Sequence, residues 1–247
     1  MSATHSFTGK KIDPPIISKD MTISQLVQFF GSTGYNARRL FEAANIMKEM
    51  IDRRCTTCLT LAGALTPIGM GNTIKTLIEN GFIDWIITTG ANVYHDLHFA
   101  YGLPVRQGHF QVDDDVLFSK QIVRIYDIFI KEIGTLQAQD IIVQREIKKI
   151  EKSHSEPYST ADMSYKLGKA ASDNSRNPEK SFLVSAYKNG VPVFIPAISD
   201  SSIGLNMLPL IFEDVKIFPN VMLDIAESTA ILWKSKLSGG IELGGGV

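Results

Sequence analysis

The chain has 247 residues, a formal net charge of −1 and 44% hydrophobic residues, which fits one large α/β domain with a sizeable core. The near-neutral charge and the lack of basic clusters argue against a nucleic-acid partner. No apolar run approaches the ~20 residues that span a bilayer, and the polar N-terminus lacks the apolar core of a secretion signal. We therefore expect a cytoplasmic protein with no nucleic-acid or membrane partner.

The N-terminal fifth of the chain is predicted to be an arm followed by two helices. Residues 1–20 are expected to form an irregular arm, because the two prolines at positions 14 and 15 exclude a helix there. A short helix over residues 22–30, capped by Thr22 or Ser24, and a long amphipathic helix over residues 36–54 should follow. Residues 21–247 are taken as a single α/β domain.

The two cysteines, Cys55 and Cys58, form a CxxC pair. Such a pair can be a redox centre or half of a zinc site, but the sequence contains no second pair. The pair also enters a predicted strand instead of opening a helix whose N-terminus would lower a thiol pKa. Two reduced structural thiols are the favoured interpretation.

The stretch from Leu59 to Leu97 organises the rest of the chain. It reads as strand (59–62), glycine-rich loop (63–71), helix (73–80), strand (84–87), small-residue turn (88–91) and helix to residue 98. Two consecutive units of this kind predict parallel strands joined by right-handed crossovers. Both loops should lie at the carboxyl edge of the sheet, where open α/β sheets bind ligands. The predicted fold class is α/β, with a Rossmann-like parallel sheet flanked by helices.

The second half of the sequence continues the alternation of helices and strands. Residues 99–112 are expected to be loop, and the three aspartates at 113–115 are interpreted as the start of a helix in preference to a metal site. The further predicted elements are helices at 116–129, 136–152, 159–169 and 178–189, a strand at 192–197, a strand-to-helix unit at 221–236 and a strand at 240–243. The last strand runs into Gly244, Gly245 and Gly246, a sequence that suits the cradling of a phosphate by backbone N–H groups. The helix that would complete this unit is missing, so we expect an incomplete C-terminus.

These segments together resemble the deoxyhypusine synthase family. The resemblance covers nearly the whole chain in order, and is carried by residues 61–71, 88–93, 96–97, 167–169, 177–179, 192–194, 200–204 and 243–247. It implies NAD as the cofactor. The residues that it implies as NAD contacts are Gly63, Ala64, Leu65, Thr66, Pro67, Thr89, Gly90, Ala91, Asp200, Gly244, Gly245 and Gly246. A carboxylate such as Asp200 can accept two hydrogen bonds from ribose hydroxyls, and a plain helix cap is the alternative role for it.

At two positions that the resemblance associates with polyamine binding, the sequence differs from the family pattern. Where the family has a glutamate and an aspartate, this chain has His95 and Leu205. Carboxylates are the expected partners of a polycation such as spermidine, so the donor or acceptor is expected to differ. The resemblance makes His95 and Asn206 candidate substrate-binding residues. His95, His98 and His109 could in principle hold a metal, but no metal is expected.

The function implied by the resemblance is NAD-dependent transfer of an aminobutyl group from spermidine or a related polyamine to an amine. The acceptor is either a protein lysine or a small amine such as putrescine. The family forms a Schiff base on a lysine that lies beyond the glycine triplet, so no catalytic residue is assigned in this chain, which is expected to be inactive alone. A homotetramer with shared active sites is also implied. The alternative is a catalytically inactive paralogue or regulatory partner subunit of such an enzyme.

Overall fold

The computed structural model describes residues 9, 11, 12, 14 and 16–245. The chain forms two compact units, residues 1–55 and 56–247, and each is treated by itself below. Most of the predicted arm lies outside the described residues, and the single domain expected over residues 21–247 stays a prediction. No helix in the described part of the chain is both long and apolar enough to cross a membrane.

The first unit contains two helices, α1 (Ile23–Phe30) and α2 (Tyr35–Asp52). Thr22 caps α1 in a reciprocal capping box with Gln25, which satisfies two backbone donors that a helix start leaves open. Gly31 ends α1 where a Cβ would lie 2.7 Å from the ring of Phe41. The two predicted helices are therefore present, and a glycine allows them to pack closely.

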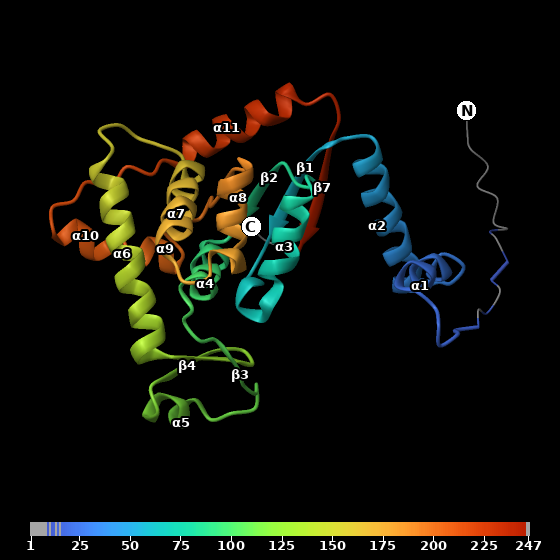
Figure 1. The fold of residues 1–247 in the computed structure, drawn as a ribbon, viewed down its shortest axis with the longest axis horizontal. Coiled ribbons are helices and arrows are strands. Elements are labelled where there is room, and N and C mark those ends of the chain that lie inside the picture. Colours follow the sequence, from blue (N-terminus) through green and yellow to red (C-terminus); the bar gives the residue numbers. More distant parts are fainter. Residues whose placement is uncertain (1–8, 10, 13, 15, 246–247) are drawn as a thin grey trace. The chain divides into compact units, whose positions relative to one another are not determined.

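The second unit carries the remaining elements (Figure 1). Its helices and strands are β1 (Thr56–Leu61), α3 (Gly71–Glu79), β2 (Trp85–Thr88), α4 (Gly90–Tyr101), β3 (Arg106–Gln107), α5 (Asp114–Ser119), β4 (Ile122–Ile125), β5 (Ile128–Lys131), α6 (Gln137–Lys152), α7 (Thr160–Asn174), α8 (Phe182–Asn189), β6 (Val193–Phe194), α9 (Ser202–Leu205), α10 (Leu208–Phe212), α11 (Val221–Lys234) and β7 (Ser238–Leu243).

Four of these strands form a parallel sheet in the order β6-β2-β1-β7. Strands β1, β2 and β6 are mostly buried, as expected of parallel strands covered by crossover helices. The residues of the edge strand β7 are exposed or half-buried. Leu59 and Leu61 of β1 point into the main core, which also contains residues of α3, α4, α7 and α8. Cys58 of the same strand points to the other face and packs with Trp85, Phe194 and Ile231 of α11. The predicted α/β fold class is confirmed.

A second, three-stranded antiparallel sheet has the order β3-β5-β4. Figure 1 shows this sheet and α5 beside the N-terminal end of α6. The helix predicted over residues 116–129 is wrong, because α5 ends at Ser119 and two strands follow. Gln121 and Tyr126 have φ angles of 54° and reverse the chain. In β5 the two isoleucines are buried and alternate with the more exposed Phe129 and Lys131, which is the period of a strand.

Two other boundaries differ from the predictions. The strand predicted at the start of residues 221–236 is not formed, because α11 begins at its Asn220 cap and extends from Val221 to Lys234. The loop predicted over 99–112 is shortened, because α4 continues to Tyr101 and ends at Gly102 in the left-handed conformation that suits a helix C-terminus. The aspartate run does start a helix, since the side chain of Asp113 caps α5.

Candidate functional site

The carboxyl edge of the parallel sheet brings together the segments that the sequence marked for a nucleotide. Gly63–Pro67 follows β1, Thr89–Ala91 follows β2, Asp200 lies six residues after β6, and Gly244 and Gly245 follow β7. All four strands run in the same direction, so these segments share one edge. Gly246 lies outside the described residues. The predicted juxtaposition is present, and the role of each residue stays a prediction.

Asn92 is the residue that shapes the first loop, and it was missed as a site residue by the sequence reasoning. Its fully buried side chain accepts hydrogen bonds from the backbone N–H groups of Leu65 and Thr66, at 2.7 and 3.1 Å. Its amide nitrogen donates to the carbonyls of Leu61 and Gly63 and to two threonine hydroxyls. One side chain on α4 therefore holds the loop after β1 in place. Its neighbours Gly90 and Ala91 were noticed because small residues in a turn are a visible signal, whereas a lone asparagine is not.

Thr89 and Gly90 join the other loops at the start of α4. The Thr89 hydroxyl donates to the carbonyl of Gly63 at 2.5 Å, which ties the loop after β2 to the loop after β1. A Cβ on Gly90 would lie 2.1 Å from Oγ of Ser201, so only glycine permits the segment after β6 to come this close. The three loops thus form one connected surface.

Asp200 is exposed and does not cap the adjacent helix. The cap of α9 is Ser201, whose hydroxyl accepts from the backbone N–H of Gly204. The carboxylate of Asp200 makes no hydrogen bond or ion pair with any described residue. This arrangement removes the plain capping role that was the alternative for Asp200, and leaves its carboxylate available at the edge.

The predicted substrate residue His95 lies in the protein interior, with 8% of its surface exposed. Its ring stacks on that of His98 at 5.2 Å between centroids. Burial lowers the pKa of His95 to about 4, so the imidazole is neutral at pH 7. A contact between His95 and a substrate stays a prediction. In the described part of the chain, no three histidine, cysteine or carboxylate side chains are grouped so as to hold a metal ion.

The second predicted substrate residue, Asn206, lines a pocket of about 330 Å³. The pocket also contains Tyr94 of α4, Asp140 and Gln144 of α6, and Ser202 and Leu205 of α9. Asn206 donates to Oδ1 of Asp140 at 2.8 Å and accepts from Gln144 at 2.8 Å. Asp140 was not predicted as a site residue, because the helix that carries it contains no recognisable motif.

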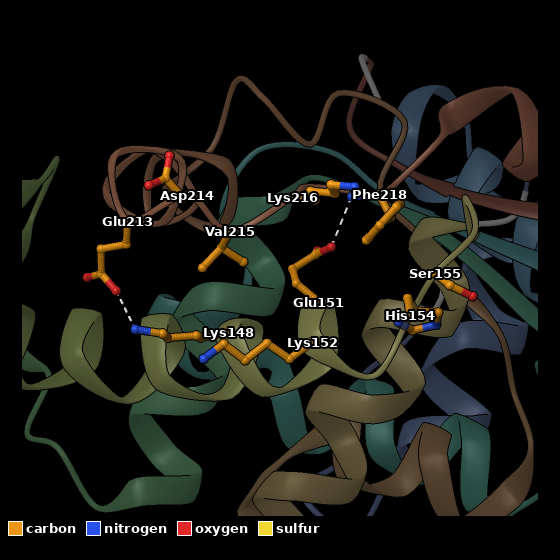
Figure 2. Close-up of a pocket in the computed structure, with 10 residues that line it drawn as sticks. All are labelled: Lys148, Glu151, Lys152, His154, Ser155, Glu213, Asp214, Val215, Lys216 and Phe218. Carbon is orange, nitrogen blue, oxygen red and sulfur yellow. Dashed lines mark hydrogen bonds and ion pairs between the residues drawn. The ribbon is translucent and has the colours of Figure 1, made fainter.

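A larger pocket, of about 430 Å³, lies between the C-terminal part of α6 and the segment after α10. Figure 2 shows the ion pair between Lys148 and Glu213, and the bond from the backbone N–H of Phe218 to Glu151. Charges of both signs are mixed along its walls, and none of its lining residues belongs to the segments that follow the parallel strands. It is therefore not part of the candidate site.

Cys58 lies within β1, away from the carboxyl edge of the sheet, and Cys55 precedes that strand. No disulfide joins Cys55 and Cys58. Burial raises the pKa of the Cys58 thiol to about 11, which is the opposite of the shift that activates a redox cysteine. This agrees with a structural role for Cys58.

Comparison with known proteins shows which family has this arrangement. The sequence model of the family named deoxyhypusine synthase matches residues 25–247. The chain belongs to the deoxyhypusine synthase family. It is 34% identical over 252 residues to a "deoxyhypusine synthase-like protein" of Nostoc punctiforme, with 96% of this chain and 62% of the relative covered. It is 36% identical over 236 residues to a "probable deoxyhypusine synthase 2" of Methanosarcina mazei, with 94% and 66% covered.

The fold is also similar to a solved structure. A crystal structure named for a deoxyhypusine synthase of Entamoeba histolytica superposes with a TM-score of 0.67 at 20% identity, covering 92% of this chain and 80% of that one. This likeness shows the fold. The chain spans 62% of the length of the Nostoc relative.

Proposed function

We propose that this protein binds NAD at the carboxyl edge of the β6-β2-β1-β7 sheet and takes part in NAD-dependent transfer of an aminobutyl group from a polyamine to an amine acceptor. Membership of a family of NAD-dependent transferases supports the proposal. The observation that carries it is the convergence of four loops, which follow four parallel strands, on one edge. NAD would supply an acceptor that takes a hydride from the donor amine and later returns it.

The residues at the edge fit a dinucleotide. Gly63 and Gly244 have positive φ angles of 63° and 92°, and a Cβ on Gly244 would lie 2.7 Å from Cβ of Ala62. These glycines leave backbone exposed at the ends of two adjacent strands, which a close approach of phosphate oxygens requires. The Asp200 carboxylate has no hydrogen-bond or ion-pair partner among the described residues and would accept bonds from ribose hydroxyls. Asn92 and Thr89 would hold the loop after β1 against the cofactor.

The first prediction concerns Asp200. We expect Asp200→Asn to weaken NAD binding about 10-fold or more, because hydrogen bonds to a charged group contribute roughly 1.5–3 kcal/mol. Isothermal titration calorimetry with NAD measures the change. Asp127→Asn is the matched control, since Asp127 is exposed in the turn between β4 and β5 and should leave NAD affinity unchanged. Equal affinities of wild type and Asp200→Asn would contradict the assigned role.

Transfer itself is tested by incubating the protein with NAD and labelled spermidine, with either putrescine or a lysine-bearing protein acceptor. Label in putrescine would identify a small-amine acceptor, and label in the protein would identify a lysine acceptor. NAD binding without label in either product would favour the alternative, an inactive paralogue or partner subunit. A homotetramer with shared active sites and a cytoplasmic location stay predictions from the family resemblance.

A further inference from the structure

The pocket lined by Asn206 contains an unpaired carboxylate held in a fixed position. Oδ1 of Asp140 accepts hydrogen bonds from the hydroxyl of Tyr94 at 2.6 Å and from the amide of Asn206 at 2.8 Å. Oδ2 of Asp140 has no hydrogen-bond partner among the described residues, and no described lysine, arginine or histidine forms an ion pair with it. Two neutral donors thus orient the carboxylate and leave one oxygen and the full charge for a ligand.

Two further polar groups of the pocket can accept hydrogen bonds from a ligand. The Gln144 amide nitrogen donates to Asn206 at 2.8 Å, which leaves the Gln144 carbonyl oxygen without a partner among the described residues. The hydroxyl of Ser202 is also unbonded within the described part of the chain, and the side chain of Leu205 supplies apolar wall. A primary ammonium group has three donors and no acceptor, so it matches an oxygen-rich pocket with one negative charge.

The pocket adjoins the edge at which NAD is proposed to bind. Ser202 lines the pocket, and the preceding residue, Ser201, packs directly on Gly90 at the start of α4. Tyr94 lies four residues after Gly90, one turn further along the same helix. A ligand in the pocket would therefore lie one helical turn from the loops that follow β2 and β6.

We propose that Asp140 recognises the primary ammonium end of an alkylamine substrate in this pocket. The inference rests on the proposed function for the reaction that the amine undergoes, but its binding claim can be tested separately. The two positions at which the family resemblance would place carboxylates hold His95 and Leu205, and α6 supplies the negative charge from a different element. One carboxylate in the pocket selects for one ammonium group at this end of the ligand.

The test is the binding of spermidine and of putrescine to the full chain, measured by calorimetry with and without NAD. Asp140→Asn should weaken binding of both amines at least 10-fold, because it removes the charge while keeping an oxygen that can accept from Tyr94. The Asp127→Asn control should bind as wild type does. Butane-1,4-diol, which has the length of putrescine without its charges, should not bind measurably to either protein.

A second pair of variants tests the pocket without removing the hydrogen bonds that Asp140 accepts from Tyr94 and Asn206. Leu205 is 64% exposed and lines the pocket, so its replacement should not prevent folding. Leu205→Lys should abolish amine binding by placing a cation beside Asp140, whereas Phe212→Lys, which adds the same charge at an exposed residue of α10 that does not line the pocket, should retain it within about threefold. Unchanged amine affinity in both Asp140→Asn and Leu205→Lys would overturn the proposal, and so would wild-type protein that binds neither amine. A third outcome separates the two proposals: the wild type binds amines, Asp140→Asn and Leu205→Lys do not, and none of the proteins binds NAD. That result would support the amine pocket and reject the proposed function.

Discussion

Replacing Asn92 by alanine is expected to lower the free energy of unfolding by about 3 kcal/mol or more and to abolish NAD binding. The substitution leaves the N–H groups of Leu65 and Thr66 without their acceptor inside the protein. An unsatisfied buried polar group costs roughly 1–3 kcal/mol, and the carbonyls of Leu61 and Gly63 lose a donor as well. The loop after β1 would then relax away from the carboxyl edge.

Urea denaturation and calorimetry with NAD measure these two effects. Asn80→Ala is the matched control, because the Asn80 amide makes a single exposed bond to the carbonyl of Thr76 at the end of α3. We expect it to change stability by less than about 1 kcal/mol and to leave NAD affinity intact. A stable Asn92→Ala protein that still binds NAD as tightly as wild type would show that this side chain does not organise the site.

The stacked histidines of α4 are expected to make the protein acid-labile. Burial lowers the pKa of His95 to about 4. The pKa of His98 is lowered to about 3 by burial and by the neighbouring His95, and the backbone carbonyl of Tyr94 opposes this change only in part. In the unfolded chain both groups titrate near 6.5. Between pH 6.5 and about 4 the unfolded state binds more protons than the folded state, so stability falls as the pH falls through this window.

His98→Phe isolates this contribution. Neither ring nitrogen of His98 makes a well-formed hydrogen bond, so an aromatic replacement should change stability little at pH 7. The wild type should take up about one proton more than this variant on unfolding at low pH. The loss of unfolding free energy between pH 6.5 and pH 4 should therefore be smaller in the variant by about 3 kcal/mol. Burial raises the pKa of Asp96 to about 7, so this carboxyl contributes more to stability as the pH falls, opposite to the histidines. Because Asp96 is present in both proteins, its contribution cancels in the comparison.

Urea denaturation at several pH values gives the two stability curves. The control is His109→Phe, since His109 is exposed and stacks on Phe110, and its curve should run parallel to that of wild type. Parallel curves for His98→Phe and wild type would instead mean that His98 is already protonated, or solvated, in the folded protein.

The segment in which the structure differs most from the predicted elements is residues 116–129, where the spacing of apolar residues fits both a helix and a strand. Residues 116–129 contain enough apolar side chains to fit a helix, but the strands β4 and β5, which are rich in β-branched residues, form a hairpin instead. Gln121 and Tyr126 adopt positive φ angles, which no residue-type signal announced. Tertiary pairing with β3 therefore decided between two local structures of similar intrinsic preference.

The environment of the predicted substrate-binding residues was also not predictable from the sequence. His95 was singled out because it replaces a carboxylate expected from the family resemblance, yet the structure buries it against His98. Asp140 was not noticed, although it faces Asn206 from a helix more than 60 residues earlier in the chain. Nothing in the sequence around Asp140 indicates which residue its side chain will meet.

The sequence by itself indicated the family through its resemblance in a series of motifs. It also determined the parallel sheet and the loops that end its strands, because apolar runs, glycines and helix caps are local signals that alternate with the period of βαβ units. Only the tertiary structure decided that Asn92 holds the loop after β1, that His95 lies in the interior, and that Asp140 and Asn206 share a pocket. These facts depend on how α4, α6 and α9 pack together, and long-range packing leaves no periodic pattern in any one segment.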